Sequence, residues 1–153
     1  MRAIFVSGIS AAWFLTTGLL FALGSSTVEA KDMKFEVQLL WGTDTTNSPN
    51  PGHKSVEPEV KKKLNELPLK WSNYFQVESK VFVVSENQAK KQPLEKCAIE
   101  IKNLGRQVEV ALFDKKGEQQ RKITQALPKG EILIWGGNAP NSTSWLVVIK
   151  RLE

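Results

Sequence analysis

Side chains that carry chemistry are scarce in this sequence of 153 residues, which has one cysteine, Cys97, and one histidine, His53. A single cysteine excludes any disulfide bond within the chain. The histidine has only Asp44 and Glu57 as acidic neighbours in the sequence, too few groups for a zinc site or a catalytic triad. We therefore predict no catalytic residues, no metal site and no cofactor, and a protein that is not an enzyme.

The lysine and arginine residues also do not form a cluster of positive charge. The chain carries 21 Lys and Arg against 16 Asp and Glu, a net charge of +5. Its densest basic run, residues 61–63, lies among Glu57, Glu59 and Glu66. Opposite charges this close neutralise one another within a Debye length of about 10 Å. Basic and aromatic residues are too sparsely interleaved to favour nucleic acid, so we predict no nucleic-acid partner.

One long apolar run is present, at the N-terminus. Residues 3–23 are uncharged and largely apolar, Arg2 precedes them, and Val28-Glu29-Ala30 follows. This order is typical of a secretory signal peptide cleaved after Ala30. The alternative is an uncleaved membrane anchor, because the run approaches the roughly 20 residues that span a bilayer. We predict a signal peptide at 1–30, export to the periplasm or outside the cell, and membrane contact only through this segment if it is uncleaved.

The rest of the chain, 31–153, has the length of one domain and the patterns of a β protein. Apolar residues alternate with polar ones over 34–41, 98–102 and 107–112. Such strands, separated by turn signals, predict an antiparallel β-sandwich or barrel of about seven to eight strands. The strongest pair, 131–135 and 144–149 around the break at 136–141, is expected to form a hairpin at the centre of the domain.

A loop, a short helix and two further strand segments complete the expected fold. Residues 42–58 are polar and proline-rich, which indicates a loop without helix or central strand. Pro58 then begins a short helix that ends before Pro68 and docks on the sheet. Its docking residues are expected to be Val60, Leu64 and Leu67. Residues 71–84 indicate two strands or one bent strand, Pro93 limits 90–96 to an edge strand, and Cys97 is expected to be a small buried hydrophobe.

Aromatic residues next to loops are the candidate ligand-binding residues. Trp41 and Trp135 each border a glycine-containing loop, His53 lies in the 42–58 loop, and Asn138 lies in the 136–141 break. Exposed tryptophans on a small β domain can stack on sugar rings or fill a partner's pocket. The alternative, that each tryptophan belongs to the core, stays open for these two. It is the expectation for Trp71 and Trp145, which are in phase with other apolar residues.

The order of the motifs resembles a group of small exported bacterial β-rich proteins of unknown function. The resemblance rests on the helix with Leu67-Pro68, the strand 71–77, the segment 127–131, Gly136-Gly137-Asn138 and a closing apolar strand. It implies one secreted β domain and supplies no activity. We expect a non-enzymatic binding or interaction module of the cell envelope, contacting a protein or a polysaccharide. The alternatives are a secreted hydrolase or hydrolase inhibitor acting through the 42–58 loop, and a structural component of an envelope assembly.

Overall fold

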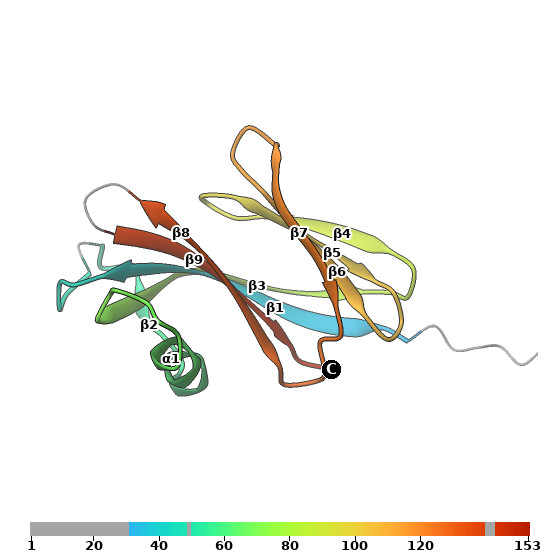
Figure 1. Ribbon diagram of the computed structural model, residues 1–153, viewed down its shortest axis with the longest axis horizontal. Helices are drawn as coiled ribbons and strands as arrows, with labels where there is room; N and C mark the ends of the chain where they lie inside the picture. Colours follow the sequence, from blue (N-terminus) through green and yellow to red (C-terminus); the bar gives the residue numbers. More distant parts are fainter. Residues whose placement is uncertain (1–30, 49, 140–142) are drawn as a thin grey trace, which may run out of the picture.

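The computed structural model describes residues 31–48, 50–139 and 143–153. The segment predicted to be a signal peptide, 1–30, lies outside these residues. The described chain forms two antiparallel sheets and one short helix, arranged as a β-sandwich (Figure 1). The predicted fold class is confirmed. The strands number nine rather than seven or eight because the 42–58 segment contributes a strand of two residues.

The larger sheet has five strands in the order β2-β3-β1-β9-β8. Their bounds are β1 Met33–Thr43, β2 Lys54–Ser55, β3 Asn73–Val84, β8 Ile132–Ala139 and β9 Thr143–Arg151. The expected β8–β9 hairpin forms, but its predicted position at the centre is wrong. The central strand is β1, which pairs with β3 on one side and β9 on the other, so β8 is left at the edge.

The smaller sheet has four strands in the order β4-β5-β6-β7. Their bounds are β4 Ala89–Pro93, β5 Ala98–Asn103, β6 Val108–Phe113 and β7 Gln119–Gln125. As Pro93 predicted, β4 lies at the edge. The main core fills the space between the two sheets and includes Phe35 and Val37 from β1 and Ile99 and Ile101 from β5. We call the side of the larger sheet that faces this core the inner face.

Strand β1 is buried on both sides because a second layer covers the outer face of the larger sheet. Leu39 packs in the main core, whereas Leu40 packs in a second cluster, and both side chains are 0 % exposed. A bulge accompanies this change, since Leu39 pairs with Glu78 and Leu40 pairs with Gln76. One extra residue, Val77, therefore bends β3, which is a single long strand.

The second layer is the helix α1, Pro58–Asn65, at the lower left of Figure 1. It begins at Pro58 as predicted, and Val60 and Leu64 are buried in the second cluster. The prediction that Leu67 also docks is wrong, because the helix ends at Asn65 and the Leu67 side chain is 40 % exposed. Among the described residues, no helix has the length and apolar character needed to cross a bilayer.

Candidate functional site

A row of three aromatic side chains crosses one end of the larger sheet. In the strand register, Trp41 of β1 lies opposite Trp145 of β9 on one side and Phe75 of β3 on the other. All three are half-buried, and the ring centroids of Trp41 and Phe75 are 6.2 Å apart. Trp41 shares the inner face with Leu39, since side chains two residues apart point the same way. We call Trp145, Trp41 and Phe75 the aromatic row.

The aromatic row lies where the two sheets no longer overlap. The end of the larger sheet at the left of Figure 1, which holds the end of β1 and the start of β9, extends beyond the smaller sheet. The nearest part of the smaller sheet is the turn between β4 and β5. From this turn the Lys96 ammonium lies 4.9 Å from the centroid of the Trp145 ring, a cation–π contact. The Trp145 end is therefore covered by a basic side chain, and the row continues from there toward Phe75.

The loop after β1 brings His53 to the aromatic row. The imidazole meets the Trp41 ring edge-on, with the ring centroids 6.0 Å apart and the planes at 61°. Two contacts hold the loop in this shape: the His53 backbone N–H donates to the Asn50 carbonyl at 3.1 Å, and the Ser48 Oγ lies 2.7 Å from the imidazole Nδ1. Two of the predicted binding residues, Trp41 and His53, are thus in contact.

The Ser48–His53 pair has the hydroxyl and the base that nucleophilic catalysis uses, but the third group of a triad is not present around it. Among the described residues, no carboxylate makes a hydrogen bond to the imidazole. Asp44, the nearest acid in the sequence, accepts the backbone N–H of Ser72 at 3.3 Å instead. Nor do the described residues hold a group of three or more potential metal ligands. The contacts of His53 orient its ring against Trp41.

The other two predicted binding residues do not join the row. Trp135 points into the main core and is 5 % exposed, so its ring offers no surface to a ligand. Asn138 lies in β8 opposite Ser144, and its side chain falls outside the part of the chain that the structure describes. The prediction that Trp145 belongs to the core is borne out in part, because its half-buried side chain packs against the main core. Phe75 was not singled out from the sequence. The signal that unites them with Trp41 is the strand register, which the alternation of residues does not reveal.

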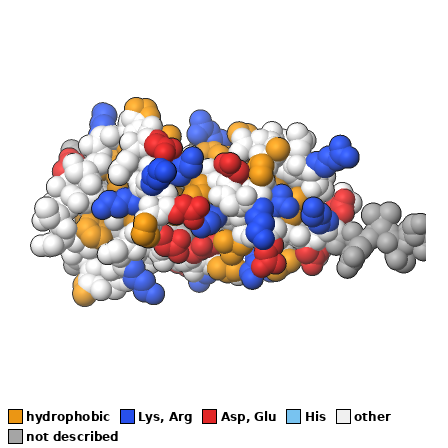
Figure 2. All heavy atoms as spheres, turned by 90° about the horizontal axis from the view of Figure 1, so that it is seen from below, with side chains coloured by type: hydrophobic (Ala, Val, Ile, Leu, Met, Phe, Trp, Pro, Cys, Tyr) orange, Lys and Arg blue, Asp and Glu red, His pale blue; other side chains and the backbone are white. Residues whose placement is uncertain are grey.

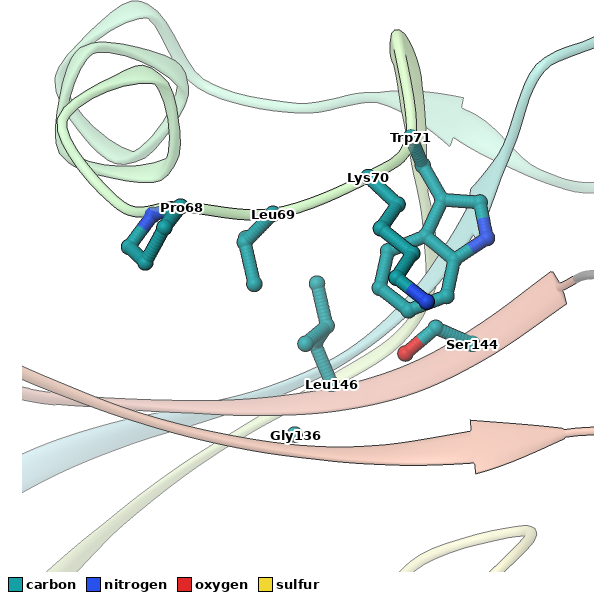
Figure 3. Close-up of a pocket in the computed structure, with 7 residues that line it drawn as sticks. All are labelled: Pro68, Leu69, Lys70, Trp71, Gly136, Ser144 and Leu146. Carbon is teal, nitrogen blue, oxygen red and sulfur yellow. The ribbon is translucent and has the colours of Figure 1, made fainter.

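The opposite, outer face of the same end is hollowed into a groove (Figure 3). β1 runs two residues into the segment predicted to be a loop, and Gly42 lies in this extension. A Cβ on Gly42 would lie 3.2 Å from the Tyr74 ring and 3.4 Å from the Trp71 ring, so only glycine lets both rings pack this closely on β1. Trp71 then forms one end of a hollow of about 380 Å³. Its lining residues are Pro68, Leu69, Lys70, Trp71, Gly136, Ser144 and Leu146.

The groove continues along β8. A second hollow of about 210 Å³ is lined by Leu67, Ile134 and Ile132, with Lys63 and Glu66 at its rim. Ile132, Ile134 and Gly136 are alternate residues of β8 and therefore share the outer face. We call the two hollows together the β8 groove, with these three residues as its floor and residues 67–71 as its wall.

Charge is mixed over the surface. On the side drawn in Figure 2, basic and acidic side chains are interspersed over the molecule rather than gathered into one field. Several of them pair directly, such as Lys63 with Glu66 at 3.5 Å and Lys122 with Glu109 at 2.9 Å. Exposed pairs of this kind add little to stability. The candidate sites on the larger sheet are therefore set apart from the rest of the surface by their apolar residues and not by their charge.

Comparison of the chain with protein-family models, with curated proteins and with solved structures gave no match. The function is therefore argued from the geometry of the aromatic row and the β8 groove.

Proposed function

We propose that this protein is a non-enzymatic binding module of the cell envelope that holds a polysaccharide on the aromatic row. The single observation that carries the proposal is the alignment of Trp145, Trp41 and Phe75 on three adjacent strands. Adjacent strands are about 4.8 Å apart, so three aligned rings span about 10 Å. Because Lys96 covers the Trp145 ring, Trp41 and Phe75 form the open part of the row, on which one sugar ring of a chain would pack.

The chemistry of the row fits a sugar better than a charged or purely apolar ligand. Aromatic rings present broad apolar faces on which the C–H bonds of a sugar ring can pack. The surroundings are polar: the His53 imidazole contacts Trp41, and Lys96 covers the Trp145 end. Hydroxyl groups at the rim of a bound sugar would meet these groups. Export, which the N-terminal segment predicts, would place the module where such polymers occur.

The test is a titration of the purified protein with soluble oligosaccharides of β-glucan, chitin and peptidoglycan type, followed by tryptophan fluorescence and calorimetry. We expect at least one of them to bind, and Trp41→Ala to weaken that binding about tenfold, equivalent to about 1.4 kcal/mol. Phe113→Ala is the matched control. Like Trp41, Phe113 is a half-buried aromatic residue, but it belongs to the smaller sheet, where the Lys91 ammonium lies 3.6 Å from its ring centroid. This variant should bind as the unmodified protein does.

A second variant tests the aromatic row without removing a ring from the sheet, in case Trp41→Ala does not fold. His53→Ala removes the ring that contacts Trp41 and leaves every core residue in place, so we expect a smaller loss of binding with an unchanged circular dichroism spectrum. Equal affinity of Trp41→Ala and Phe113→Ala, or no binding by any oligosaccharide of the panel, would overturn the proposal. Hydrolysis that disappears in His53→Ala would instead support the alternative of a hydrolase.

A further inference from the structure

The four sheet edges of the described chain are not equally protected. Exposed edge strands invite pairing with other chains, and proteins discourage this with short strands, charges and proline. β2 has only two residues, and the rest of that edge is β3, which carries Glu78 and Lys80. β4 carries two lysines and a proline, and β7 carries an arginine and a lysine. β8 has eight residues, Ile-Leu-Ile-Trp-Gly-Gly-Asn-Ala, without a charge or a proline. It is the edge that lacks protection.

The β8 edge offers hydrogen bonds to a further strand. β8 pairs with β9 on one side, and among the described residues no strand pairs with its other side. In an antiparallel pair, alternate residues direct their N–H and C=O groups away from the partner strand. A strand laid beside β8 would take up these groups and extend the sheet.

The β8 groove runs beside this edge and would receive the side chains of such a strand. Its floor of Ile132, Ile134 and Gly136 repeats every second residue, which is the spacing of side chains on one face of a strand, about 6.8 Å. Its wall includes Leu67, a large apolar side chain that is 40 % exposed. Gly136 keeps the deeper hollow open, because a Cβ there would lie 2.6 Å from the Leu146 Cδ2. Alternate apolar side chains therefore fit the groove.

Charge distinguishes the two ends of the β8 groove. Lys63 at the far end is paired with Glu66. At the Trp71 end, Lys70 lines the hollow (Figure 3), and no carboxylate of the described chain forms an ion pair with it. This end is therefore basic, and a ligand with a carboxylate there would complement it.

We infer that the edge of β8 and the β8 groove bind an extended peptide segment of another protein by strand addition. The segment carries apolar side chains at alternate positions and an acidic residue at the end that meets Lys70. This site is separate from the aromatic row, which lies on the inner face of the sheet. The inference does not depend on the sugar-binding proposal.

The probe is a fluorescent synthetic peptide of alternating valine and threonine with two glutamates at one end, measured by fluorescence anisotropy. Two versions, with the glutamates first or last, cover both strand directions. We expect one version to bind, and its analogue with N-methyl groups on alternate residues of one edge to bind at least tenfold more weakly, because methylation removes the backbone donors. Replacing the glutamates with glutamines should weaken binding to the unmodified protein and strengthen binding to Lys70→Glu, where the glutamates would face a like charge.

The protein variants separate this site from the rest of the surface. Ile134→Lys places a charge on the groove floor and should abolish binding. Leu67→Asp places a charge on the groove wall and should also abolish binding. Because the Leu67 side chain is exposed, this variant is expected to keep the fold. Lys115→Glu, which makes the same change of charge as Lys70→Glu in the exposed turn between β6 and β7, should have no effect.

Three results would overturn the inference. The first is binding that survives both Ile134→Lys and Leu67→Asp. The second is equal affinity for the methylated and unmethylated peptides, or no binding of either. The third is a dimer in sedimentation whose β8 amides are protected from hydrogen exchange, which would show that a second copy of the chain occupies the edge. Loss of sugar binding in Trp41→Ala with intact peptide binding would show that the two sites are independent.

Discussion

A buried glutamine in the central strand provides the sharpest test of the energetics of this fold. Gln38 of β1 is 1 % exposed, and neither its Oε1 nor its Nε2 has a hydrogen-bond partner among the described residues. It points to the outer face between Val148 of β9 and Ser79 of β3. Leaving a buried polar group without a partner costs about 1–3 kcal/mol. Gln38 should therefore lower the stability of the domain.

The perturbation is Gln38→Met, which keeps the length of the side chain and replaces the amide with apolar atoms. We expect the free energy of unfolding to rise by about 1–3 kcal/mol, because the cost of desolvating the amide disappears while the packing remains. In a domain of this size each kcal/mol moves Tm by roughly 3–5 °C. The expected rise in Tm is thus about 3–15 °C.

The assay is urea unfolding followed by tryptophan fluorescence, with thermal unfolding by circular dichroism as a second measure. Gln76→Met is the matched control. Gln76 shares the outer face but is half-buried, so its replacement should change stability by less than about 0.5 kcal/mol. A Gln38→Met variant that is less stable than the unmodified protein by 1 kcal/mol or more would refute the reasoning, since it would show that the amide is satisfied.

Three further predictions concern single side chains. Leu64→Ala should lower the free energy of unfolding, measured in urea, by about 2–5 kcal/mol, because it leaves a cavity between α1 and the sheet. Leu67→Ala, at an exposed position, should lower it little. Equal losses in the two variants would contradict the assigned helix face. Burial, with the nearby Glu78 carboxylate, raises the pKa of Cys97 to about 11, so the thiol stays protonated at pH 8. Alkylation there should be about 100-fold slower than for a thiol of pKa 9, and a rate like that of free cysteine would contradict the burial. Gly42→Val should displace Trp71 and Tyr74 and shift their near-ultraviolet circular dichroism, and an unchanged spectrum would contradict their packing on β1.

Local patterns predicted the fold class and most of the elements. The alternation in 34–41, 98–102 and 107–112 corresponds to β1, β5 and β6, because side chains on opposite faces of a strand meet different surroundings. Pro58 predicted the start of α1, and Pro93 predicted an edge strand. These features depend on neighbouring residues alone, which is why the sequence carries them.

Pairing between distant strands could not be predicted in this way. Two apolar strands around a turn indicate a hairpin, and nothing in them indicates that β1, more than a hundred residues earlier in the chain, takes the other side of β9. The candidate sites could not be predicted for the same reason, because they depend on pairing between distant strands. Trp145 is in phase with core residues of β9 and was assigned to the core, and only the register with Trp41 places it in the aromatic row. Trp71 contacts β1 because Gly42 lacks a side chain.

The pairing of β1 with β9 has a consequence for how the protein is made. The first strand of the sheet finds one of its two neighbours in Thr143–Arg151, the last of the described strands. Of the described strands β9 is synthesised last, so β1 lacks this neighbour while the eight earlier strands are being made. Closing so long a loop is also slow.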